Sequence, residues 1–100
     1  MALESTIQAS IIKTLQEEFP GAVILKTDPS YIQGFPDLLF LQSNFWAALE
    51  VKRSISSPRQ PNQMYWVNKL DTLSFSSFIY PANIDEVIDE LDSVLIRSSR

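Results

Sequence analysis

GFPDLLFLQSNFWAALEVK, residues Gly34–Lys52, is the stretch that decides the fold. Two apolar runs flank a short polar segment, Gln42-Ser43-Asn44. This pattern is typical of two antiparallel strands joined by a tight turn. The first run is apolar throughout from Leu38 to Leu41, as in a strand that is covered on both faces. We therefore expect a buried hairpin at the centre of the molecule.

The register of this hairpin determines where two acidic side chains lie. If the turn is centred on Ser43-Asn44, Asp37 lies directly opposite Glu50, with Cβ atoms roughly 4.5–5.5 Å apart. Two carboxylates at that distance repel each other, so we expect positive charge between them. Lys52 shares the strand face of Glu50 and supplies one charge, and a divalent cation would supply two more. A turn shifted by one residue would put the two acids on opposite faces and remove the predicted metal site.

Composition limits the chemistry of such a site. One hundred residues, 45% of them apolar, predict a single domain over residues 1–100. The sequence contains neither cysteine nor histidine, which excludes thiolate and imidazole ligands. A metal would be bound by oxygen atoms, which suits Mg²⁺ or Mn²⁺.

Charge and hydropathy indicate which partners the protein is expected to have. The net charge of −4 argues mildly against a passive nucleic-acid binder. No stretch reaches the ~18 apolar residues of a membrane span, and no secretory signal is present, so we expect no membrane association and a cytoplasmic protein. Basic residues gather around the hairpin and the loop after it, and four of them are candidate DNA phosphate contacts: Lys26, Arg53, Arg59 and Lys69.

The flanking segments predict a mixed sheet with helices around it, in the α/β or α+β class. The expected order is α-β-β-β-α-β-α, from apolar periodicity and from proline, glycine and serine breaks. Its helices span about Ala2–Phe19, Asn62–Leu73 and a stretch from Asn83, as N-cap, to Leu95; its strands span Ala22–Lys26, Pro36–Leu41, Phe45–Val51 and Phe75–Tyr80.

Three residues then form a recognisable pattern: Pro-Asp at Asp37, a spacer of about a dozen residues, and Glu-Val-Lys ending at Lys52. The bland interpretation is a surface aspartate plus a solvated Glu–Lys pair, but it does not explain the like-charge register. The pattern resembles the PD-(D/E)XK nuclease superfamily. The wider sequence, from Glu4 to about Leu91, resembles its VRR-NUC (virus-type replication-repair nuclease) domains, through Gly-Phe-Pro-Asp-Leu, Ala-Leu-Glu-Val-Lys and Gln63 seven residues before Leu70.

This resemblance implies a fold and a set of roles. The fold would be that of the restriction endonucleases. Asp37 and Glu50, with the carbonyl of Val51, would bind the metal, and Lys52 would be the catalytic lysine. Glu4 would be an accessory acid and further ligand, although a glutamate in a first helical turn also favours the helix dipole. Gln63 would face the site, although it could also satisfy a buried backbone group.

The resemblance also implies an activity. We expect a Mg²⁺- or Mn²⁺-dependent endodeoxyribonuclease that leaves 5′-phosphate ends, acts on branched DNA and resolves four-way (Holliday) junctions as a homodimer. The family name suggests a phage or prophage origin. The alternatives are cleavage of flaps, single strands or general duplex, and an inactive module that binds DNA or protein.

Aromatic residues have a simpler expectation. Trp46 and Trp66 are expected in the core. Tyr65 could stack on a base, but packing is the preferred interpretation.

Overall fold

The structure, a computed structural model, describes residues 3–98. Its elements follow the predicted order and are α1 (Glu4–Glu18), β1 (Val23–Lys26), β2 (Leu38–Gln42), β3 (Phe45–Val51), α2 (Pro61–Leu73), β4 (Phe75–Ile79), the short 3₁₀ helix η1 (Pro81–Asn83) and α3 (Ile84–Ser98). The predicted start of the first helix at Ala2 lies outside the described residues.

The four strands form one sheet in the order β1-β2-β3-β4. The first three are antiparallel neighbours, whereas β4 lies parallel to β3 after the crossover through α2. Gln42 pairs with Phe45 and Leu38 pairs with Leu49, so the predicted hairpin register is confirmed. The turn is tight because Ser43 adopts a positive φ of 54°.

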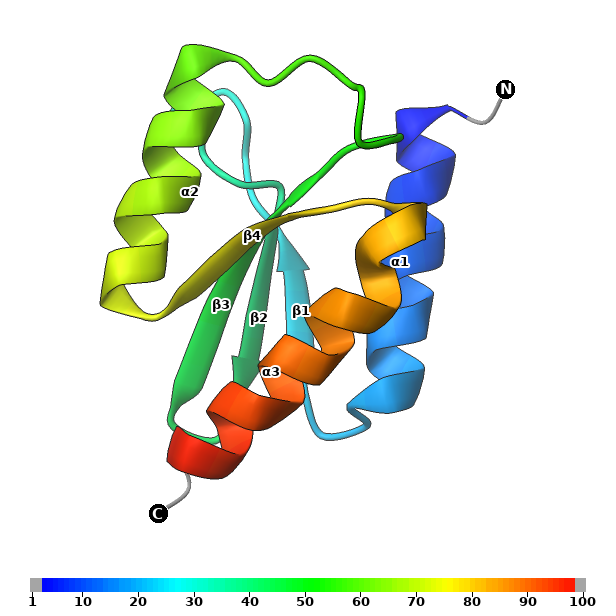
Figure 1. Ribbon diagram of the computed structural model, residues 1–100, viewed down its shortest axis with the longest axis vertical. Helices are drawn as coiled ribbons and strands as arrows, with labels where there is room; N and C mark the ends of the chain where they lie inside the picture. The colour runs from blue at the N-terminus through cyan, green and yellow to red at the C-terminus, as the bar shows by residue number, and fades with distance from the viewer. Residues whose placement is uncertain (1–2, 99–100) are drawn as a thin grey trace.

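Helices cover the two faces of the sheet unequally. Helices α1 and α3 pack on one face, and α2 packs on the other, against β3 and β4 (Figure 1). The first face carries Leu38, Phe40 and Leu49, all fully buried. Phe40 meets Phe19 of α1 edge to face, with ring centroids 5.1 Å apart. The main core therefore lies between the sheet and the α1–α3 layer.

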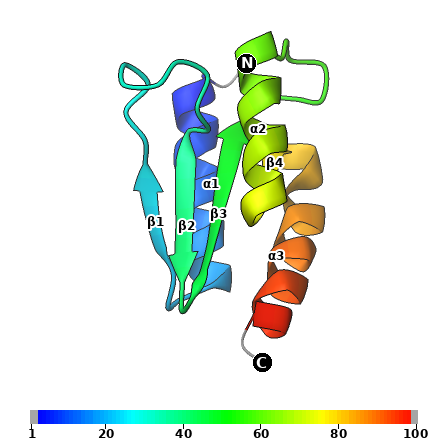
Figure 2. The same ribbon diagram turned by 90° about the vertical axis from the view of Figure 1, so that its left-hand side faces the viewer.

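The opposite face of β1 and β2 has no helix over it (Figure 2). Val23, Leu25 and Leu41 are exposed there and Leu39 is half-buried, and we call these four residues the uncovered face. The expectation that β2 is covered on both faces is wrong, because α2 packs mainly against β3 and β4 and leaves Leu41 exposed.

The loop from Thr27 to Asp37 is held against the start of α2. Gly34 has a φ of +84°, and a Cβ at this position would lie 2.5 Å from Cγ of Asn62. Only glycine satisfies both the positive φ and this close approach. The loop therefore has a defined position beside α2.

The start of α3 differs from the predicted cap. Asn83 lies in η1, where its side-chain oxygen accepts the Tyr80 N–H at 2.8 Å and its amide donates to the Phe78 carbonyl at 3.0 Å. The side chain of Asn83 therefore bonds the turn before α3 instead of capping this helix, as the sequence had predicted. Across residues 3–98, no helix combines the length and apolar character needed to cross a membrane.

Candidate active site

Functional side chains meet where the strands end, on the sheet face that carries α2. The register places Asp37 next to Glu50 across the hairpin, and Glu50 next to Phe78 of β4. Thr27 extends this row beyond β1, because its N–H donates to the Asp37 carbonyl at 2.8 Å. Alternation along β3 turns Lys52 to the same face as Glu50. Period-two patterning and the hairpin turn thus bring these residues together.

The two acids are in contact, with Glu50 buried and Asp37 half-buried. The Val51 N–H donates to Oδ2 of Asp37 at 2.9 Å, which orients this carboxyl group across the hairpin. Glu50 is only 3% exposed. Burial, the neighbouring charge of Asp37 and a hydrogen bond to its side chain raise the pKa of Glu50 to about 8, against a smaller opposing effect of Lys52. The pair can therefore share a proton, or both groups can ionise around a cation.

Gln63 of α2 links the lysine to the acids. Lys52, 6% exposed, donates from Nζ to Oε1 of Gln63 at 2.8 Å, and Nε2 of Gln63 lies 3.3 Å from Oε2 of Glu50. The amide orientation that satisfies both contacts leaves its oxygen to the lysine and its nitrogen to the carboxyl group. Gln63 thus holds Lys52 near Glu50 through one side-chain amide.

The local sequence explains why Gln63 lies here. Pro61 at the first helical position fixes the start of α2, and Gln63 two residues later also accepts the Gln60 N–H at 3.0 Å. The same side-chain oxygen therefore caps the helix and binds Lys52. The sequence predicted the inward position of Gln63 and left open a bond to a backbone group. It did not show that one side-chain oxygen would accept from both Lys52 and the Gln60 N–H.

Comparison with known proteins agrees with this geometry. A solved structure titled "VRR_NUC domain protein" superimposes with a TM-score of 0.66 and 17% sequence identity, over 94% of this chain and 89% of that one. The chain has the VRR-NUC fold. No protein-family model matches the sequence, and no curated protein matches it.

The VRR-NUC fold accounts for the layers and for the strand order of this chain. Since the identity is 17%, the similarity lies in the backbone arrangement. The chemistry of this chain must therefore be inferred from its own side chains at the strand ends. Asp37, Glu50, Lys52 and Gln63, the residues singled out in the sequence, converge there.

Glu4 approaches the site from a different element than the other acids. It is exposed at the first turn of α1, which covers the other face of the sheet. Its charge contributes the smallest of the effects that raise the pKa of Glu50. Among residues 3–98, no group of three acidic side chains lies close enough to hold a metal ion. The role of Glu4 as a further ligand alongside Asp37 and Glu50 therefore stays a prediction.

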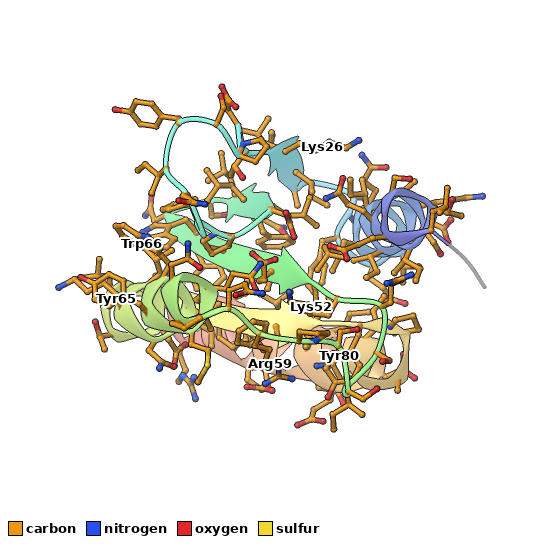
Figure 3. All side chains as sticks on the ribbon, turned by 90° about the horizontal axis from the view of Figure 1, so that it is seen from above. Lys26, Lys52, Arg59, Tyr65, Trp66 and Tyr80 are labelled. Atoms are coloured by element: carbon orange, nitrogen blue, oxygen red, sulfur yellow. The ribbon has the colours of Figure 1, made fainter. Side chains whose placement is uncertain are left out.

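The four candidate phosphate contacts lie on different elements. The guanidinium of Arg59 sits over the Phe78 ring, 4.2 Å from its centroid. Viewed onto this end of the sheet, Lys52 lies between Lys26 and Arg59 (Figure 3). Arg53 is exposed directly after Lys52, and Lys69 is exposed on α2. Phe78 has no charge and follows no motif, so the sequence did not identify it as the support for Arg59.

The aromatic expectations need correction. Trp46 and Trp66 are half-buried, and Tyr65 is 58% exposed. Trp66 contacts Phe35 of the Thr27–Asp37 loop, with ring centroids 5.4 Å apart, and Tyr65 edge to face at 5.3 Å. Helical periodicity predicted that Trp66 faces the protein. It could not show that Trp66 packs against a surface loop instead of lying in the core.

Proposed function

We propose that this protein is a metal-dependent DNA endonuclease. The observation that carries the proposal is the opposed pair of carboxyl groups, the half-buried Asp37 and the buried Glu50, with Lys52 linked to it through Gln63. Two acids side by side with a buried lysine cost stability and serve no packing purpose. The VRR-NUC fold supports the same interpretation.

The donor set fits Mg²⁺ or Mn²⁺. These ions take carboxylate, carbonyl and water oxygens, and Asp37, Glu50 and the Val51 carbonyl would hold the ion. Burial and the neighbouring charge of Asp37 raise the pKa of Glu50, and a bound cation would offset both effects. Glu4, whose charge acts on Glu50, would be an accessory acid and a further ligand. A bound ion would lower the pKa of a water ligand and polarise the scissile phosphate.

The chain's own residues would orient the substrate and stabilise the transition state. Lys52 would donate a hydrogen bond to the attacking water or to a phosphate oxygen as negative charge develops on it. Gln63 would fix the direction of the lysine, since its amide bonds both Lys52 and Glu50. Arg59, held over Phe78, would contact a neighbouring phosphate, as would Lys26, Arg53 and Lys69.

We propose branched DNA as the substrate, with four-way junctions favoured, and a homodimer as the active form. Symmetric cleavage of two strands needs two sites at a fixed spacing, which a two-fold dimer supplies. The uncovered face supports a second copy of this chain as its occupant. Val23 and Leu25 of β1 lie beside Leu41 and Leu39 of β2, and none of these four side chains is charged. Such a patch is self-complementary around a two-fold axis.

A dimer disruption tests this assembly. We expect light scattering to give a mass about twice 11.4 kDa for the wild type. Introducing Leu25→Lys and Leu41→Lys should give monomers, because like charges would face each other across the axis. Ile96→Lys, an exposed site on α3, serves as the matched control and should leave the mass unchanged. A monomeric wild type at micromolar concentration would contradict the homodimer.

Cleavage assays test the activity itself. End-labelled four-way junction, flap, single strand and linear duplex should be incubated with Mg²⁺, Mn²⁺ or EDTA. We expect cleavage with either metal and none in EDTA, fastest on the junction and with paired nicks on opposite strands. Faster cleavage of the flap or single strand would support the nuclease activity and contradict the four-way junction as the preferred substrate. Binding without cleavage under every metal condition would indicate an inactive binding module.

A further inference from the structure

A pocket lies beside the candidate active site, in the loop that connects β1 and β2. It has a volume of about 380 Å³ and is lined by Thr27, Asp28, Tyr31, Ile32 and Phe35. This volume falls within the range of about 300–1,000 Å³ typical of small-molecule sites. The catalytic proposal uses none of the side chains in this wall.

The pocket continues into a row of aromatic rings. Tyr31 is 84% exposed at its rim, and Phe35 in its wall contacts Trp66, which in turn contacts Tyr65. Figure 3 shows Tyr65 and Trp66 together on α2, beside the loop. We call these four residues, Tyr31, Phe35, Trp66 and Tyr65, the aromatic track. The two tyrosines at its ends are largely exposed and are not needed for core packing.

The track begins at the candidate site. Thr27, in the pocket wall, donates its N–H to the Asp37 carbonyl at 2.8 Å and its hydroxyl to the Pro36 carbonyl at 2.7 Å. On α2, Trp66 follows Gln63 by three residues, so the two lie on neighbouring positions of one helix face. The pocket wall and the proposed metal ligand Asp37 are therefore joined directly.

The loop is ordered by its own bonds, so the pocket is already formed. Tyr31 donates its N–H to the Asp28 carbonyl at 3.2 Å, and Phe35 donates to the Ile32 carbonyl at 3.3 Å. Gly34 is pressed against Asn62 of α2. A preformed aromatic site loses little conformational entropy when it binds a flat ligand.

The chemistry of the lining selects the ligand. Exposed aromatic rings stack on nucleobases. Lys69 lies four residues after Tyr65 on the same face of α2, where its positive charge can contact the phosphate backbone of the DNA. Asp28 binds the Ser30 N–H and hydroxyl through Oδ1, at 2.9 and 2.7 Å, which leaves Oδ2 to accept a base amino group. These bonds lower the pKa of Asp28, so it remains an ionised acceptor that would repel a phosphate.

We propose that the aromatic track binds unpaired nucleobases of the DNA substrate next to the cleaved phosphate. The proposal deepens the nuclease function and rests on it for the choice of DNA as the ligand. A base within a duplex has its faces stacked and its edge paired, so only an unpaired base can enter the pocket. The track therefore favours substrates with unpaired nucleotides at the branch over continuous duplex.

Binding measurements in EDTA test the track separately from cleavage. Fluorescence anisotropy should compare a single strand, a flap with unpaired nucleotides and a linear duplex of the same length. A 2-aminopurine in the unpaired segment reports stacking through quenching. We expect the wild type to bind the unpaired DNAs more tightly than the duplex and to quench the probe.

Substitutions at the two ends of the track identify its contribution. Tyr31→Ala and Tyr65→Ala should each weaken binding of unpaired DNA by roughly 5- to 100-fold and reduce quenching, with little effect on duplex. Tyr31→Phe and Tyr65→Phe keep the ring and should bind like the wild type. Ile96→Ala removes an exposed apolar side chain from α3 and serves as the matched control.

The outcomes separate the two proposals. Unchanged affinity and quenching in both alanine variants would contradict base binding by the aromatic track, and so would equal wild-type affinity for duplex and unpaired DNA. Neither result would contradict the proposed nuclease activity. Tighter binding of RNA than DNA of the same sequence would overturn the choice of DNA. Selective binding of unpaired bases that is lost in the alanine variants, with no cleavage in any metal, would support the track and overturn the nuclease.

Discussion

Lys52→Ala is expected to lower the rate of metal-dependent DNA cleavage by about 10²- to 10³-fold while leaving DNA affinity in EDTA nearly unchanged. The lysine is buried at the strand end beside Glu50, and its Nζ is held 2.8 Å from the Gln63 amide oxygen. A donor fixed in this way stabilises charge that develops in the transition state more than it binds ground-state DNA. Single-turnover cleavage with Mn²⁺ and anisotropy in EDTA measure the two quantities.

Two comparisons make this prediction specific. Lys13→Ala removes an exposed lysine of α1 and should cleave like the wild type. Gln63→Ala leaves Lys52 in place but removes its support, so we expect a smaller loss, with a change in its pH–rate profile. Urea denaturation of each variant checks folding. A Lys52→Ala variant that folds and cleaves at the wild-type rate would contradict the assigned role.

The stability of the metal-free protein is expected to fall as the pH rises between about 5 and 8. Glu50 has a reference pKa of 4.5, and its surroundings in the folded state raise this pKa to about 8. The folded state therefore keeps a proton that the unfolded chain has lost within this range. The resulting contribution to the free energy of unfolding is complete below pH 4.5 and is lost as the pH approaches 8, at no more than about 1.4 kcal/mol per pH unit.

Urea denaturation in EDTA from pH 5.5 to 8.5 measures this slope. Glu50→Gln keeps the shape of the side chain without the titrating group and should flatten it, whereas Glu17→Gln, at an exposed position of α1, should not. Mn²⁺ should raise the wild-type stability most above pH 7, where the carboxylate is available to bind it. Equal slopes for the wild type and Glu50→Gln would show that Glu50 does not titrate in this range.

The candidate site follows from the sequence because its geometry is set by short-range rules. A tight turn at Ser43-Asn44 fixes the hairpin register, and the two-residue period of a strand then places Asp37, Glu50 and Lys52 on one face. The inward position of Gln63 follows from helical periodicity in the same way. These rules involve only neighbouring residues or one turn, so no knowledge of distant packing is needed.

Features that depend on distant packing could not be predicted. Continuous apolar character in β2 suggested cover on both faces, but α2 packs mainly on β3 and β4 and leaves Leu41 exposed. The guanidinium of Arg59 contacts the Phe78 ring, although the whole of α2 separates these two residues in the sequence.

By itself, the sequence determined the order of the elements, the hairpin register and the pairing of the two acids, because turn residues and hydrophobic period act locally. Only the tertiary structure decided which sheet face stays uncovered, that Gln63 both caps α2 and holds Lys52, and that Trp66 meets Phe35 beside a pocket. These outcomes depend on how whole helices and loops pack against the sheet. Such packing brings together residues far apart in the chain, and no local spacing encodes it.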